Sequence, residues 1–250
     1  MAKKIGKATK ALSLGASTIG AAVSFQVGGA EGVMIGSALT AVVKDIGRRL
    51  LSPKEISRIE RVRREAEEKI IANLNKGSKP RKDLRKELLE ELLEGTLLLA
   101  RKTYEEKKLP YISNLLATTP FTNTPIENMS HTLQVAERLS YRQLCLLAII
   151  DKQEYGDIGL SNKPFNEEKG KHHNELAKGI YQDLNLMIVD GIIAMVVSKE
   201  AGAMMAAGVG FIVPTELKLL YPGDLLVNGM GLSGIPSSET KPLIKMLKGR

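Results

Sequence analysis

The chain has 250 residues, of which 43% are hydrophobic and 26% charged, as is usual for one large or two small folded domains. Aromatic residues make up 4% and tryptophan is lacking, which argues against a nucleic-acid platform of stacked rings and against a carbohydrate groove. The single cysteine, Cys145, can form no intramolecular disulfide and offers no metal-site spacing. Because it lies in the apolar run 144–150, we expect it in the core of a protein from a reducing compartment.

The net charge of +8 is placed unevenly along the chain. Residues 1–64 contain twelve Lys and Arg residues and four acidic residues, which gives this segment +8. The remaining residues contain 24 basic and 24 acidic groups, which cancel. The basic charge therefore belongs to the N-terminal quarter, and it indicates an anionic partner such as lipid or nucleic acid.

Residues 11–43 contain one charged residue, Glu31, and are rich in small and β-branched side chains. Small residues recur at every fourth position, so a helix would align them in one stripe along which two backbones can approach closely. We predict that this glycine zipper, within residues 1–50, is a packing seam for self-association into a homo-oligomer. The seam comprises Ala16, Gly20, Ser24, Gly28, Gly32, Gly36 and Thr40.

Basic residues flank the apolar run on both sides, which favours both ends of the run on the cytoplasmic side of a membrane. A re-entrant hairpin turning at residues 28–32, or a surface helix that inserts as an oligomer, fits this order better than a single span. A cleavable signal peptide is a further alternative. We expect association with the anionic inner face of the membrane through Lys3, Lys4, Lys7, Lys10, Lys44, Arg48 and Arg49.

A helical body is predicted for residues 51–150. Ser52 as N-cap, Pro53 at the first helical position and Glu55 in a capping box predict a helix to about residue 74, stopped by Gly77. Its charged residues are interpreted as a solvated face, and Ile56, Ile59, Val62, Ala66 and Ile70 are expected to point inward. Further helices are expected at 82–108, 111–117, 126–139 and 141–150, the last capped by Ser140 and central to the core.

Residues 151–171 are polar and are expected to form a long loop. After it, a helix is predicted at 174–189, strands at 191–197 and 208–213, and helices at 214–227 and 237–248. This order is that of a winged-helix-like α+β module, which we place at residues 172–250. The predicted fold class is therefore mostly α: a zipper helix or hairpin, a helical body and this C-terminal module.

Three short blocks, 51–55 (LSPKE), 104–110 (YEEKKLP) and 139–144 (LSYRQL), resemble those of a loose set of bacterial proteins of unassigned role. Members of that set pair a Gly-rich start with a helical body, and some look like abortive-infection proteins. The resemblance implies a bacterial defence or toxicity effector, and it offers no functional residues to carry over.

The sequence contains no phosphate-binding glycine motif and no nucleophile elbow. Adjacent His172 and His173 would point in different directions on a helix, so we predict no metal site. Glu105 and Lys107 have the spacing of a nuclease motif, but they fall on a predicted helix and are interpreted as a solvated charge run. We therefore expect a protein that is not an enzyme and that needs no cofactor.

The leading hypothesis is a cytoplasmic, self-associating effector that acts at the membrane through its basic-flanked glycine zipper. One alternative is a nucleic-acid-binding regulator that uses the C-terminal module, although that module has no net positive charge for phosphate contacts. The other alternative is a soluble oligomeric scaffold with the zipper packed inside.

Overall fold

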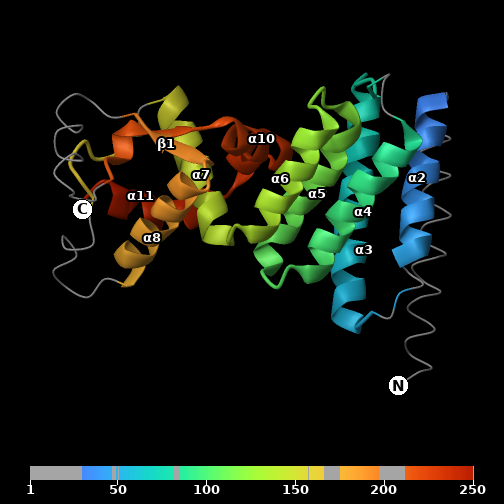
Figure 1. Ribbon diagram of the computed structural model, residues 1–250, viewed down its shortest axis with the longest axis horizontal. Helices are drawn as coiled ribbons and strands as arrows, with labels where there is room; N and C mark the ends of the chain where they lie inside the picture. The colour runs from blue at the N-terminus through green and yellow to red at the C-terminus, as the bar shows by residue number, and fades with distance from the viewer. Residues whose placement is uncertain are drawn as a thin grey trace. The chain divides into compact units, whose positions relative to one another are not determined.

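The structure is a computed structural model that describes residues 30–46, 49, 51–81, 85–156, 158–165, 175–196 and 212–249. Within these residues the protein is mostly helical, as predicted, and the chain forms two compact units, residues 1–138 and 139–250 (Figure 1). The predicted body was expected to end at residue 150 and to exclude the first 50 residues. Instead, the first unit ends at Arg138 and includes the helix before residue 50.

The first unit is a bundle in which helices α2 to α6 lie alongside one another (Figure 1). Helix α3 packs against both α4 and α5, α2 packs mainly against α4, and α6 lies on the other side of α4. The elements are α2 (Ala30–Ile46), α3 (Pro53–Asn75), α4 (Lys86–Lys102), the 3-10 turn η1 (Glu106–Lys108), α5 (Leu109–Thr118), η2 (Thr119–Phe121) and α6 (Ile126–Arg138).

Local signals define α3 as predicted. The Ser52 hydroxyl accepts from the Glu55 backbone N–H, and the Glu55 carboxylate accepts from the Ser52 N–H, which completes the capping box. Beyond its end, Gly77 adopts a φ of 86°, a left-handed conformation that glycine reaches without strain. The five predicted inward residues of α3 are all buried.

The helix predicted at 82–108 is wrong at its C-terminal end, since α4 ends at Lys102. Thr103 has extended backbone angles, and its hydroxyl donates to the Leu99 carbonyl at 2.8 Å, which closes the helix. The chain then makes η1, where Lys108 is buried and donates from Nζ to the Ala136 carbonyl at 3.0 Å, at the end of α6. The charge run 105–108 is therefore not one solvated helical face.

The second unit is built around α7 (Tyr141–Tyr155), whose residues 143–150 are all buried, Cys145 among them. The Ser140 capping box with Gln143 is confirmed, but α7 continues through Asp151 to Tyr155, where a loop was expected. Its other elements are α8 (Glu175–Val189), β1 (Ile193–Met195), η4 (Pro214–Glu216), β2 (Leu217–Leu219), α10 (Tyr221–Met230), η5 (Leu232–Gly234) and α11 (Ser237–Leu247).

Strands β1 and β2 pair antiparallel, with Ile193 opposite Leu219 and Met195 opposite Leu217. The helix predicted from residue 214 is therefore wrong at its start: Pro214 begins only a 3-10 turn, β2 follows, and α10 begins at Tyr221. Of the predicted strand 208–213, residues 208–211 lie outside the described residues, and Ile212 forms a single bridge with Phe165. The winged-helix-like arrangement is not confirmed.

Candidate functional site

Helix α2 has one continuous apolar face, and that face is buried against α4. Its apolar residues recur at intervals of three and four, the spacing of an amphipathic helix. Burying each large aliphatic side chain contributes about 1.5–3 kcal/mol, so this face dominates the attachment of α2. The buried side chains are Ile35, Ala38, Leu39, Val42, Val43 and Ile46.

A charged bridge joins the end of α2 to α4. Arg49 lies three residues beyond Ile46, and its Nη2 donates to Asp45 Oδ2 of α2 at 2.8 Å and to Glu94 Oε1 of α4. The hydrogen bonds to Asp45 and Glu94 raise the pKa of Arg49 above its ordinary value. All three side chains are more than a third exposed, and such pairs are worth about 0–1 kcal/mol. The bridge therefore adds little to the strength of the apolar contact.

The predicted packing seam is only partly within the described residues. Ala16, Gly20, Ser24 and Gly28 lie outside them, whereas Gly32, Gly36 and Thr40 belong to α2. Gly36 is buried, and the half-buried Thr40 donates from its hydroxyl to the Gly36 carbonyl at 2.8 Å. These three positions are helical, as the zipper predicts, and residues 30–32 begin α2 instead of forming the second half of a turn at 28–32. The role of the stripe in self-association stays a prediction.

The predicted lipid-binding residues also lie only partly within the described residues. Lys3, Lys4, Lys7, Lys10 and Arg48 lie outside the described residues. Lys44 is exposed in the last turn of α2, where a cation also interacts favourably with the helix dipole. Arg49 is exposed as expected but already holds two carboxylates within the protein. A headgroup anion would compete with those carboxylates for the guanidinium.

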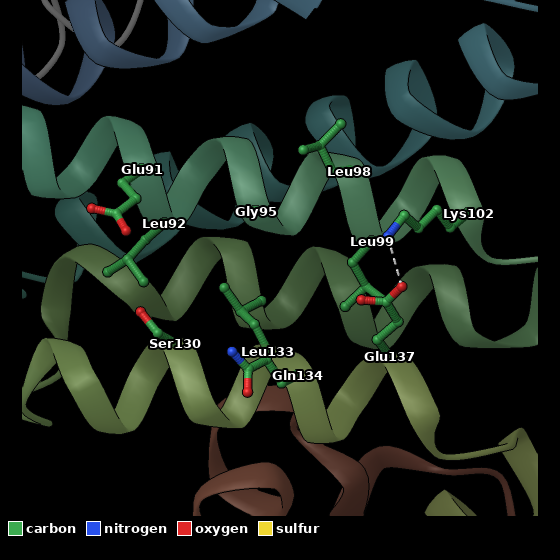
Figure 2. A pocket seen from close by; sticks show the side chains of 10 residues that line it. All are labelled: Glu91, Leu92, Gly95, Leu98, Leu99, Lys102, Ser130, Leu133, Gln134 and Glu137. Atoms are coloured by element: carbon green, nitrogen blue, oxygen red, sulfur yellow. Dashed lines mark hydrogen bonds and ion pairs between the residues drawn. The ribbon is translucent and has the colours of Figure 1, made fainter.

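A groove of about 260 Å³ runs between α4 and α6 (Figure 2). Gly95 lets the two helices approach, since a Cβ there would lie 3.2 Å from Leu133 Cδ1. One end is closed by the Lys102–Glu137 ion pair at 2.9 Å, and Glu91 lies at the opposite end (Figure 2). The charged side chains of the groove therefore lie at its two ends, with leucine side chains between them, and they do not converge on one reacting atom.

A serine and a lysine approach each other between α5 and α3. Lys69 Nζ lies 2.6 Å from Ser113 Oγ, which is 3.1 Å from Glu65 Oε2, and burial lowers the pKa of Lys69. Such a pair can activate a serine nucleophile. Ser113 is completely buried and its hydroxyl is 2.7 Å from the Pro110 carbonyl, so no substrate carbonyl can reach it. The cluster joins the two helices and has no catalytic access.

One buried charge pair was missed by the sequence analysis. Arg63 and Glu67, one turn apart on α3, are both 3% exposed, although this part of α3 was interpreted as solvated. Helical spacing contained the signal, since Arg63 is four residues from Ile59 and Glu67 three from Ile70, both fully buried. Helical position therefore indicates the burial of both side chains, in spite of their charge.

No cluster of three metal-ligating side chains occurs among the described residues. His131 is exposed on α6, and His172 and His173 lie outside the described part of the chain. None of the helices in the described ranges is both long enough and apolar enough to cross a membrane.

The chain was compared with models of protein families, with curated proteins and with solved structures. No family model, curated protein or solved structure matches it.

Proposed function

We propose that the protein is a non-enzymatic, self-associating effector that acts at an anionic membrane surface through residues 1–50. The observation that carries the proposal is α2: a helix with an extended apolar face that is attached at the edge of a bundle mainly through one neighbouring helix. In its 17 residues, charges are confined to Glu31 near the start and to Lys44 and Asp45 at the end.

The charge distribution supports the choice of an anionic membrane. All of the net charge of +8 falls within residues 1–64, on both sides of the almost uncharged run 11–43. A membrane surface offers headgroups to the basic flanks and hydrocarbon to the apolar run. Duplex DNA would use the charge and leave the apolar run without a role.

The length of α2 within the described residues favours a helix that lies in the membrane interface. At about 1.5 Å per residue, its 17 residues span about 25 Å, less than the hydrocarbon thickness of about 30 Å. An amphipathic helix of this length buries its apolar face at the boundary between headgroups and acyl chains. Self-association through the small-residue stripe would then bring several such helices together.

The proposal has two further parts. A role in bacterial defence or toxicity is supported by the resemblance of the three sequence blocks. A winged-helix-like second unit, which would hold or sense a trigger, is supported by the antiparallel pair of β1 and β2 among the helices of this unit.

The experiment is flotation of the full-length protein with vesicles of anionic or neutral phospholipid, at low and high salt. We expect flotation with anionic vesicles, with an electrostatic part that weakens with salt and an apolar part that does not. Replacing Lys3, Lys4, Lys7 and Lys10 together by Ser should weaken flotation. The matched control removes the same charge from the second unit at Lys152, Lys163, Lys241 and Lys245 and should leave flotation unchanged.

A gel-shift with duplex DNA is run beside the flotation. Tight, salt-sensitive DNA binding without flotation would overturn the membrane proposal and favour the nucleic-acid-binding regulator. Neither flotation nor DNA binding, with an oligomer in solution, would favour the soluble scaffold.

A further inference from the structure

Helix α2 is attached to the first unit in two ways that differ in kind. The apolar face is closed against α4, while the Arg49 bridge to Asp45 and Glu94 is open to water at the end of the helix. On its other side α2 is exposed, with Val33 53% accessible and Lys44 and Asp45 in solvent. The helix can therefore leave without first disrupting the contact of α3 with α5.

The apolar face keeps α2 in place in water, since detachment would expose six buried side chains to solvent at once. Hydrocarbon removes that penalty, because the side chains pass from one apolar surroundings to another. Detachment is therefore unfavourable in solution and becomes possible where a membrane receives the helix.

The Arg49 bridge makes the attachment of α2 sensitive to anionic groups in the surroundings. A guanidinium binds phosphate and carboxylate with the same planar geometry, so an anionic headgroup competes directly with Asp45 and Glu94. Arg49 is 39% exposed, which leaves it accessible to such a headgroup in the packed form.

We propose that α2 is a detachable helix that exchanges its contact with α4 for an anionic membrane surface, and that the Arg49–Asp45–Glu94 bridge is the latch that a headgroup opens. This inference rests on the proposed membrane function and describes its regulation: the membrane-active face is stored inside the bundle until an anionic surface is present.

The test is to lock α2 onto α4. Arg49→Cys and Glu94→Cys are combined and joined with a flexible bis-maleimide, because the two native side chains meet at their ends. The control joins Arg58→Cys to Glu106→Cys, a second Arg–Glu pair (2.8 Å) that links α3 to η1 and leaves α2 free. Cys145 is 2% exposed and should take up no reagent in the folded protein, which mass spectrometry of the parent verifies.

Flotation is measured with vesicles of mixed phosphatidylserine and phosphatidylcholine. We expect cross-linking of the 49–94 pair to lower vesicle affinity at least tenfold relative to the same double variant before cross-linking. Cross-linking of the 58–106 control should cause no loss relative to its own unlinked form. If the locked protein binds vesicles as well as its unlocked form, α2 does not leave α4 and the inference is overturned, while the proposed function stands. If no form binds vesicles, including the parent, both are overturned.

The latch has its own matched pair of variants. Glu94→Gln removes a partner of Arg49, whereas Glu87→Gln removes the same charge from an exposed position of α4 away from the bridge. We expect Glu94→Gln to raise vesicle affinity up to about fivefold, the range for an exposed ion pair, and to exceed Glu87→Gln. Equal effects would show that only net charge matters and would overturn the latch.

Discussion

Inside α3, Arg63 Nη1 donates to both carboxylate oxygens of Glu67, at 2.7 and 2.8 Å. Both side chains are almost fully buried, and the Arg63 Nε has no hydrogen-bond partner in the described structure. Burial raises the pKa of Glu67 from 4.5 to about 7, even though the Arg63 charge acts in the opposite direction. Desolvation of the carboxylate is thus the larger effect.

This raised pKa predicts a pH dependence of stability. The folded form binds the Glu67 proton more tightly than the unfolded form, so this contribution is full below pH 4.5 and is lost as the pH rises through about 7. Glu67→Gln lacks the titration. We expect the unfolding free energy of the parent to fall relative to that of Glu67→Gln between pH 5.5 and 8, by at most about 1.4 kcal/mol per pH unit.

Urea unfolding followed by circular dichroism at several pH values measures that difference. The pH trend is the readout, because Gln also alters the hydrogen bonds of Arg63 at every pH. Glu60→Gln, at a half-buried position of α3, controls for removal of a carboxylate from this helix. A parent–variant difference that is flat with pH would contradict the prediction.

The packing of α2 predicts that Leu39→Ala destabilises the protein by about 2–5 kcal/mol, because Leu39 is 2% exposed on the face that contacts α4. Val33→Ala, at a position 53% exposed on the same helix, should change the stability by less than about 1 kcal/mol. Thermal and urea unfolding measure both. Equal effects of the two substitutions would mean that α2 is not packed in solution.

Gly223 predicts a steric effect in the second unit. A Cβ there would lie 2.4 Å from the Ile192 carbonyl oxygen, where α10 begins against β1. Gly223→Ala should therefore shift backbone and lower stability by about 1–3 kcal/mol. At Gly234 nothing lies within 4 Å of the added carbon, so Gly234→Ala is the matched control. The melting temperature of Gly234→Ala should stay close to that of the parent.

The small-residue stripe predicts the effect of bulky side chains on self-association. Gly20→Leu lies on the stripe and should reduce the mass measured by light scattering, since it holds two backbones apart. Gly15→Leu adds the same side chain next to the stripe and should leave the mass unchanged. A Gly20→Leu oligomer as large and stable as the parent's would show that the seam is wrongly placed.

Short-range signals made several elements predictable. The capping residues Ser52 and Ser140 each satisfy backbone N–H groups locally, so the helix starts they predict do not depend on distant contacts. The burial of α7 could also be predicted, because the apolar run 144–150 offers no polar face to water, and the structure buries all of it.

The predictions that were wrong concern segments whose structure depends on contacts with residues far away in the sequence. Pro214 fits the first turn of a helix, but pairing of Leu217–Leu219 with β1 takes precedence over local preference. At the candidate site, the apolar face of α2 was expected to serve a membrane or a second copy. Nothing within residues 30–46 reveals that α4 covers that face, because the partner lies about 45 positions further along the chain.

That separation also has a consequence for synthesis. Arg49 and Glu94 are 45 positions apart, and translation at about 5–20 residues per second needs roughly 2–9 s to produce the second after the first. Helix α2 therefore leaves the ribosome earlier, by about this interval, than the part of α4 that covers it. For that interval the apolar face of α2 has no α4 to pack against, so a chaperone or a nearby membrane can contact it before its intramolecular partner does.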